Sequence, residues 1–196
     1  PPVVLIHGGW QDSTAWREQV EYFAEQYDVI TYDIRGHGQS GPTETEQYSV
    51  GLFVNDLETL LVDLDIERPI LAGLSVGGLI VRGFLARHPD WVRGAVVGGP
   101  FQSMTALTPP TDLNPFLSPV SGVSQMVSTI GSAATFRSLV TTMEAANGGT
   151  WLSVDADVRE QAISSAGDVS TAEYTKLFRV IYEHDPADIS HVETPL

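Results

Sequence analysis

A serine between glycines is the clearest chemical signal in this sequence. Gly73-Leu74-Ser75-Val76-Gly77 has the form G-x-S-x-G and stands between an apolar run, residues 70–72, and a helical apolar stripe that begins at Leu79. In a strand–turn–helix setting this pattern presents a serine hydroxyl on a sharp turn. The hydroxyl would lie at a helix N-terminus, where backbone N–H groups stabilise a developing negative charge. The pattern therefore predicts Ser75 as a nucleophile, and a glycine-rich turn with an incidental serine is the alternative.

A second glycine pair follows the first apolar run, in His7-Gly8-Gly9-Trp10. Glycines let a backbone N–H approach a substrate oxygen closely, so we expect an oxyanion hole made by the N–H groups of Gly9 and Val76. A plain strand-to-loop turn is the alternative for the two glycines. We interpret His7, at a strand end, as a structural hydrogen-bonding residue and not as a base.

A polar turn, residues 33–40, follows the second apolar run and reads D-I-R-G-H-G-Q-S. Nothing in its spacing demands catalysis. A metal site at Asp33 and His37 would need a third ligand at a suitable spacing, and the sequence offers none. We therefore predict neither a metal nor an organic cofactor.

The elements that must position these residues alternate along the first hundred positions. Strand-like runs cover residues 3–6, 29–34, 69–74 and 91–97. Between them lie helical stripes at residues 16–27, with Asp12 or Ser13 as N-cap, at residues 53–64, and from residue 79 to before Pro89. This rhythm predicts an α/β fold in which the strands are parallel neighbours in one sheet with helices on both faces.

Composition changes after Gly99, where prolines crowd residues 100–119. Helical patterns then cover residues 126–143, 157–166 and 171–183, with Asn147-Gly148-Gly149 as a stop. We predict a core over residues 1–99, a helical cap over residues 100–190, and the start of a further core strand at residues 191–196. Trp10, Phe101 and Met126 should line an apolar cavity above Ser75, because ligand pockets are mostly apolar; the alternative is that Trp10 only packs its own loop.

Three segments, HGG, D-x-R-G-H-G-x-S and GLSVGG, resemble in order and spacing the α/β-hydrolase fold superfamily. The resemblance is greatest to the branch of single-domain esterases, haloperoxidase-like enzymes and C–C hydrolases, and it is specific over about residues 1–100. It implies a Ser75 nucleophile, oxyanion donors at Gly9 and Val76, and a structural loop at residues 35–40 near the site entrance. A serine at position 75 argues against the dehalogenase and epoxide hydrolase branches, whose nucleophile is an aspartate.

The resemblance also implies that a catalytic acid and then a histidine follow the nucleophile along the chain. The histidines after Ser75 are His88, His184 and His191. We expect His88 to point away from the site and the other two to be solvated surface, with an unusual local replacement as the alternative. The acid and base are therefore expected beyond Leu196, so the chain resembles a hydrolase shortened at both ends, and we expect little hydrolase activity from it alone.

Twenty-five acidic residues against ten lysines and arginines give a net charge of −15. Such a charge argues against binding to nucleic acid or to an anionic membrane surface. It fits either a salt-adapted source or arginine-favouring codon usage, because Lys176 is the only lysine. The absence of cysteine excludes disulfides and a cysteine nucleophile. No targeting segment is recognisable, and we expect a cytoplasmic protein.

Together these patterns predict a serine hydrolase that acts on a small-molecule ester or related acyl substrate without a cofactor. The alternatives are C–C bond hydrolysis, lactone opening, acyl transfer to peroxide, or a receptor-like member that binds a ligand without turnover.

Overall fold

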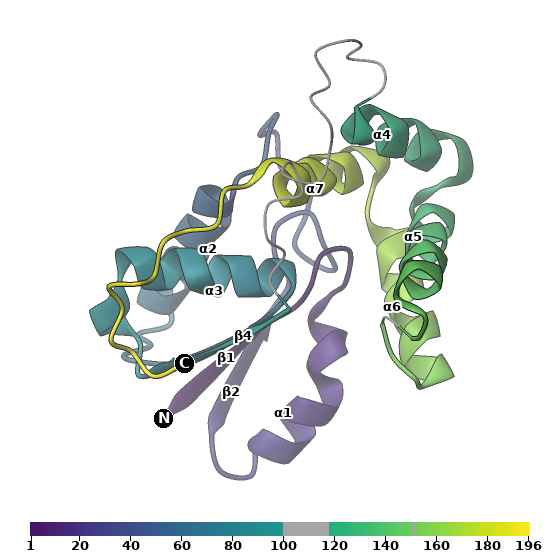
Figure 1. Ribbon diagram of the computed structural model, residues 1–196. Coiled ribbons are helices and arrows are strands. Elements are labelled where there is room, and N and C mark those ends of the chain that lie inside the picture. Colours follow the sequence, from purple (N-terminus) through teal and green to yellow (C-terminus); the bar gives the residue numbers. More distant parts are fainter. Residues whose placement is uncertain (100–117, 151) are drawn as a thin grey trace.

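The structure is a computed structural model that describes residues 1–99, 118–150 and 152–196. Its centre is a four-stranded sheet in the order β2-β1-β3-β4 (Figure 1). The strands are β1 (Pro2–Ile6), β2 (Asp28–Tyr32), β3 (Ile70–Leu74) and β4 (Gly94–Gly98). Each neighbouring pair runs parallel, so the carboxyl ends of all of them meet at one edge. The prediction of a parallel α/β sheet is confirmed.

Helices cover both faces of this sheet, as the alternating pattern predicts. The short helix η1 (Ser13–Trp16) and α1 (Arg17–Phe23) lie on one face, and α2 (Val50–Asp63) and α3 (Val76–Arg87) on the other (Figure 1). Asp12 is the N-cap of η1, because its carboxylate accepts the N–H of Thr14 at 2.9 Å.

The fourth strand begins later than the predicted range of 91–97. Residues Pro89–Trp91 form a 3₁₀ turn, η2, in which the N–H of Trp91 donates to the carbonyl of His88 at 3.1 Å. Pro89 favours this helical start because its fixed φ suits the first helical position. The apolar run around Trp91 therefore enters the sheet only at Gly94.

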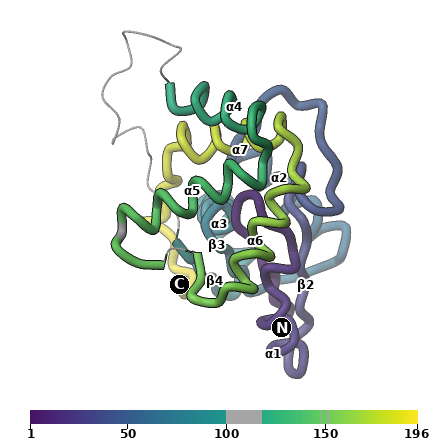
Figure 2. Tube along the Cα trace, turned by 90° about the vertical axis from the view of Figure 1, so that its right-hand side faces the viewer, coloured from purple at the N-terminus to yellow at the C-terminus, as the bar shows by residue number. Residues whose placement is uncertain are grey.

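Four further helices lie beyond the carboxyl ends of the strands (Figures 1 and 2). They are α4 (Pro119–Ile130), α5 (Ser132–Asn147), α6 (Ala156–Asp168) and α7 (Thr171–Glu183). The predicted single helix over residues 126–143 is wrong, because Gly131 has φ +83° and ψ 166° and divides it. The predicted stop is confirmed: α5 ends at Asn147, and Gly148 caps it in the left-handed conformation.

Aromatic contacts join the strand layer to these helices. The indole of Trp10, which follows β1, stacks on the ring of Tyr174 in α7 at 4.6 Å and lies 5.8 Å from the ring of Phe136 in α5. Buried apolar residues continue without interruption from the sheet into α4–α7. The division at residues 99 and 190 stays a prediction, since residues 100–117 lie outside the described ranges.

The last residues, predicted to start another core strand, form no strand in the structure. They reach the outer edge of β4, where the carbonyl of Pro195 accepts the N–H of Ala95 at 2.9 Å. Thr194 adds a hydrogen bond from its hydroxyl to the carbonyl of Pro89 at 3.0 Å.

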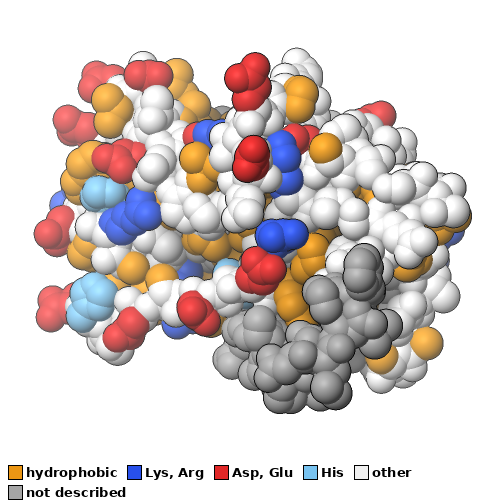
Figure 3. Space-filling view, turned by 90° about the horizontal axis from the view of Figure 1, so that it is seen from above, with side chains coloured by type: hydrophobic (Ala, Val, Ile, Leu, Met, Phe, Trp, Pro, Cys, Tyr) orange, Lys and Arg blue, Asp and Glu red, His pale blue; other side chains and the backbone are white. Residues whose placement is uncertain are grey.

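The surface carries the acidic excess of the sequence. Seen from above, acidic side chains are spread over the face and are not gathered in one patch (Figure 3). Among the helices of the described ranges, none is long and apolar enough to cross a membrane.

Candidate active site

Ser75 lies where β3 passes into α3, in a backbone conformation that few residues other than glycine adopt. Its φ is +55° and its ψ is −113°. The turn is held on both sides, because the N–H of Ser75 donates to the carbonyl of Gly98 at 2.8 Å and its carbonyl accepts the N–H of Leu79 at 3.1 Å. Such a conformation costs on the order of 1–3 kcal/mol and persists only where the surroundings impose it.

The glycines of this turn are required by close backbone approach. A Cβ on Gly73 would collide with the carbonyl oxygen of Gly77, and a Cβ on Gly77 would collide with the carbonyl oxygen of Ile6. The strand, the turn and the helix therefore pack closer than side chains would allow. This packing fixes the serine at the carboxyl edge of the sheet.

Two backbone N–H groups near Ser75 have no acceptor in the described part of the chain, those of Gly9 and Val76. Val76 is the first residue of α3, where helical N–H groups have no partner within the helix. A Cβ built on Gly9 would lie 3.0 Å from Cγ2 of Val76, so the two residues are direct neighbours. The predicted oxyanion donors thus lie together, and both follow a carboxyl end of a strand.

Two buried histidines hold the loop that carries Gly9. Nε2 of His7 accepts the N–H of Ile34 at 3.0 Å, and Nε2 of His37 accepts the N–H of Trp10 at 3.1 Å. The accepting nitrogens carry no proton, so each Nδ1 donates, to the carbonyl of Gly8 at 2.7 Å and of Arg35 at 3.0 Å respectively.

Burial keeps both imidazoles neutral. It lowers the pKa of His7, and it lowers the pKa of His37 to about 4, where the nearby His7 adds to the effect. The interpretation of His7 as a structural residue fits this geometry. His37 fixes Trp10, whose φ of +60° is itself strained.

The charged side chains Asp33 and Arg35 of the polar turn at residues 33–40 form contacts within the fold. The Asp33 carboxylate accepts the N–H of Ser13 at 2.7 Å and the N–H of Gln39 at 2.8 Å. Burial acts to raise the pKa of Asp33, but these hydrogen bonds outweigh it and lower the pKa. Arg35 forms a bidentate ion pair with Asp56. Within the described residues, no group of three histidine, aspartate or glutamate side chains could hold a metal ion.

A cavity of about 300 Å³ lies over Ser75. Its lining is mostly apolar and comes largely from the loops after β1 and β3 and from α5 and α7: Gly8, Gly9, Trp10, Gln11, Leu74, Ser75, Gly99, Phe136, Leu139, Met143, Leu152, Phe178 and Ile181. Trp10 and Ser75 therefore line one cavity, and Trp10 packs its loop as well. Met126, expected in this lining, is not part of it: Met126 lies on α4, which packs on α7, and it is 40% exposed. Phe101 lies outside the described residues.

Several lining residues were missed from the sequence. Phe178 and Ile181 belong to the apolar stripe of α7, which also includes Tyr174 and Leu177 at helical spacing, so the periodicity could have found them. Phe136, Leu139 and Met143 show the same spacing on α5. Gln11 belongs to no periodic apolar stripe, so its place in the lining could be identified only from the tertiary structure.

The histidines that follow Ser75 lie outside the lining of this cavity. His88 is the C-cap of α3, at the end of the helix away from Ser75 as predicted, and its Nε2 lies 3.3 Å from Oε2 of Glu58. His191 is exposed, as expected. The prediction that His184 is solvated is wrong: it is 8% exposed, and its Nδ1 lies 2.9 Å from the carbonyl oxygen of Ile181. His184 is the C-cap of α7 and lines a hollow together with residues of α2 and α3, so tertiary packing covers it.

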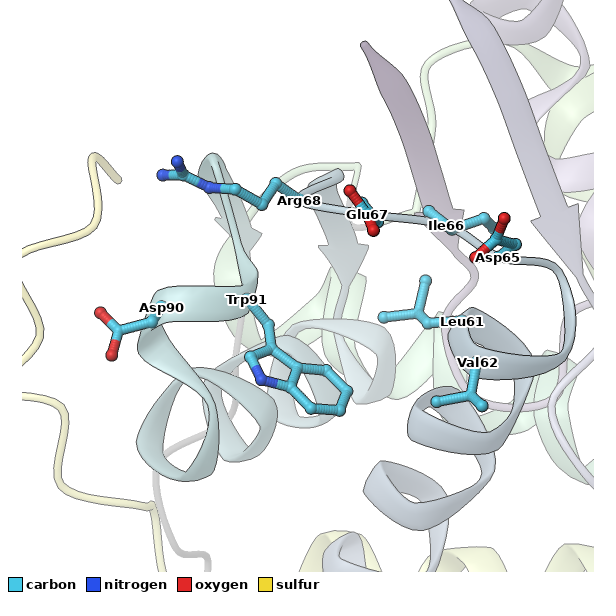
Figure 4. A pocket seen from close by; sticks show the side chains of 8 residues that line it. All are labelled: Leu61, Val62, Asp65, Ile66, Glu67, Arg68, Asp90 and Trp91. Carbon is cyan, nitrogen blue, oxygen red and sulfur yellow. The ribbon is translucent and has the colours of Figure 1, made fainter.

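A larger hollow, of about 360 Å³, lies at the opposite end of the sheet (Figure 4). Trp91, Leu61 and Val62 face it, with Asp65, Glu67, Arg68 and Asp90 around it. None of its lining residues is a serine, threonine or histidine, so it offers neither a hydroxyl nucleophile nor an imidazole base. In the described ranges, the Ser75 cavity combines a hydroxyl, two unpartnered backbone N–H groups and a mostly apolar wall.

Comparison with curated proteins finds relatives that match about half of the chain. A hydrolase of (E)-2-((N-methylformamido)methylene)succinate from Acinetobacter baylyi is 38% identical over 102 residues, which cover 52% of this chain and 38% of the relative. The non-heme chloroperoxidase CPO-A1 of Kitasatospora aureofaciens is 38% identical over 88 residues, covering 44% of this chain and 32% of the relative. The chain spans 27% of the length of the first curated relatives it matches.

Solved structures match almost the whole chain. The enol-lactonase of Burkholderia xenovorans has a TM-score of 0.74 at 22% identity, over 95% of this chain and 66% of that one. A thermophilic esterase from Thermogutta terrifontis has a TM-score of 0.75 at 20% identity, over 94% and 64%. At such identities the likeness shows the fold. The family model described as alpha/beta hydrolase fold matches residues 1–156, and the chain therefore belongs to the α/β-hydrolase family.

Proposed function

We propose that this chain carries the nucleophile and oxyanion hole of a serine hydrolase that cleaves esters or related acyl compounds. Ser75 would attack the carbonyl carbon, and the N–H groups of Gly9 and Val76 would bind the oxyanion. The observation that supports this most is the combination of a strained serine with two unpartnered N–H groups beside it, facing an apolar cavity. Donors fixed in advance at a developing oxyanion are the largest single contribution to acyl transfer in many enzymes.

The cavity favours uncharged substrates. Among its described lining residues there is no lysine, arginine or histidine that could pair with a carboxylate. A buried carboxylate without a cation is strongly disfavoured. In this respect the chain would differ from the Acinetobacter relative, which is named for a succinate, a compound with carboxylates. We therefore propose a neutral ester with an apolar acyl group, which the aromatic and aliphatic wall would bury.

A base and an acid are needed to complete this site. Within the described residues no histidine lines the cavity with Ser75. We propose that the base and the acid are contributed by residues outside this 196-residue sequence. Removal of triad members leaves a rate about 10³–10⁴ above that of water, from the oxyanion hole and binding alone.

The test is acylation of Ser75 by p-nitrophenyl butyrate, followed by intact-mass spectrometry and peptide mapping. Without a base both steps are slow, but p-nitrophenolate leaves without needing a proton, whereas hydrolysis of the butyryl ester on Ser75 needs an activated water. Over a long incubation one butyryl group should therefore accumulate on Ser75 and none on the Ser75→Ala variant. Ser49→Ala, which changes a serine at the start of α2, serves as the matched control and should acylate like the parent.

Two results would contradict the proposal. If no butyryl group forms on Ser75, the cavity binds ligands without acyl chemistry. If the chain instead turns over the ester at ordinary enzyme rates and Ser75→Ala does not, the base lies within the sequence, and His184 and His191 are the first to replace.

A further inference from the structure

Gln11 has a side chain that the fold uses only in part. It is 9% exposed and lines the cavity over Ser75. Its Oε1 accepts the N–H of Gly8 at 3.2 Å, and because an N–H needs an acceptor, the oxygen and not the amide nitrogen faces Gly8. The Nε2 group, with two N–H donors, has no acceptor among the described residues.

This unpartnered amide lies close to the reacting serine. A Cβ built on Gly8 would stand 2.7 Å from Oε1 of Gln11 and 3.5 Å from Cβ of Ser75, so both side chains flank the same point. Other than Ser75 and Gln11, every described side chain in the lining is apolar or a glycine. No described side chain of this mostly apolar wall offers the Nε2 group an acceptor, so its N–H groups are satisfied only from the cavity, by water or by a ligand oxygen.

We propose that Nε2 of Gln11 donates a hydrogen bond to a second, neutral acceptor oxygen of the substrate, a few bonds from the scissile carbonyl. An ether or keto oxygen in the acyl group fits this position, whereas a plain alkyl chain leaves the donor unsatisfied. The inference rests on the proposed acyl site, and it names the substrate class as acyl groups that carry an oxygen near the carbonyl. Gln11 is thus a substrate-binding residue that sets specificity.

The test measures binding on a Ser75→Ala background, which leaves esters intact and needs no base. Benzyl methoxyacetate and benzyl butyrate have acyl chains of the same length and differ by an oxygen in place of a methylene. NMR titration gives the Kd of each ester and follows the side-chain NH₂ signals of Gln11. The chemical shifts of these signals should change when benzyl methoxyacetate is added and should not change when benzyl butyrate is added.

Two variants separate the donor from the contact with Gly8. Gln11→Glu keeps an oxygen for the Gly8 N–H but removes both donors, and Gln11→Met removes both functions. The preference for methoxyacetate, taken as the ratio of the two Kd values, should fall about two- to tenfold in both variants, the worth of a neutral hydrogen bond. Gln26→Glu, an equal charge change at an exposed helix end, should keep the preference.

The inference is overturned if the preference is unchanged in both variants, or if Gln11→Met loses it while Gln11→Glu keeps it, because the Gly8 contact would then decide. These results are independent of acylation. If Ser75 is never acylated, the proposed function is refuted. The two Kd values still show whether Gln11 selects esters with the additional oxygen.

Discussion

Glu173 in α7 is a buried carboxylate whose removal should destabilise the chain strongly. It is 2% exposed, accepts a hydrogen bond from the hydroxyl of Tyr48, and pairs with Lys176, Nζ to Oε1 at 2.8 Å. Nζ also donates to the carbonyl of Thr43 at 3.0 Å and lies 5.3 Å from the centre of the Tyr48 ring. This cluster joins α7, which lines the cavity, to the loop after β2.

Glu173→Ala leaves the Lys176 ammonium and the Tyr48 hydroxyl without their carboxylate. Breaking a buried pair by removing one partner costs about 3–5 kcal/mol. For a chain of this length the melting temperature should then fall by about 6–20 °C, at 2–4 °C per kcal/mol. Glu173→Gln keeps an acceptor for Tyr48 and should cost less, about 1.5–3 kcal/mol, the worth of a charged hydrogen bond.

Urea unfolding followed by circular dichroism measures these losses. Glu160→Gln is the matched control. Glu160 in α6 pairs with a basic residue as Glu173 does, Arg137 in α5, but these two side chains are 60% and 54% exposed. Its replacement should therefore change the free energy of unfolding little. Adding Lys176→Met to Glu173→Gln should cost less than the two single changes together, since it removes the uncompensated charge. If Glu173→Ala is no worse than Glu160→Gln, or if the double variant is simply additive, the burial argument is wrong.

Three further predictions concern the loop, the turn and the cavity. The unfolded imidazole binds a proton near pH 6.5, whereas burial lowers the pKa of His37 to about 4, so acid favours unfolding. Between pH 7 and 4 His37 alone should lower the free energy of unfolding by about 3 kcal/mol, with His7 adding to the loss, and urea titrations should show a smaller decrease for His37→Gln than for the parent chain. Gly77→Ala should abolish Ser75 acylation and destabilise the fold, because its Cβ meets the Ile6 carbonyl, whereas Gly122→Ala, with open space around it in α4, should gain about 0.5–1 kcal/mol by urea unfolding. Phe136→Ala, at a site 2% exposed, should cost about 3–5 kcal/mol and raise the acylation rate of hexanoate relative to butyrate; an unchanged ratio would remove Phe136 from the acyl wall.

Local pattern was enough to predict the sheet, the Ser75 turn and most helices. Apolar runs of strand length that alternate with helical stripes have one economical solution, a parallel sheet covered on both faces. The turn at Ser75 was predictable because glycines at fixed offsets from a serine are a backbone requirement, and the collisions at Gly73 and Gly77 show that requirement. Helix ends with glycine, as at Gly148, are local in the same way.

The predictions that were wrong concern features decided by packing between distant parts of the chain. Gly131 divides α4 from α5 although the apolar periodicity continues across it, because each helix packs on different partners, α4 on α7 and α5 on α6. Trp91 lies in a 3₁₀ turn despite its apolar neighbours. His184, the C-cap of α7, is buried beside residues of α2 and α3, a packing that no local pattern specifies.

The sequence by itself determined the family, the position of Ser75 in a strand-to-helix turn and the proposed oxyanion donors, since these depend on neighbours along the chain. Only the tertiary structure decided the shape of the cavity, the neutral state of His7 and His37, and the unpartnered amide of Gln11. Burial and hydrogen-bond partners depend on residues far apart in sequence. Trp10 stacks on Tyr174, and the Tyr48 hydroxyl donates to Glu173, only when α7 packs against the loops at the carboxyl edge of the sheet. The free energy of these contacts depends on that packing, and a linear pattern carries no record of it.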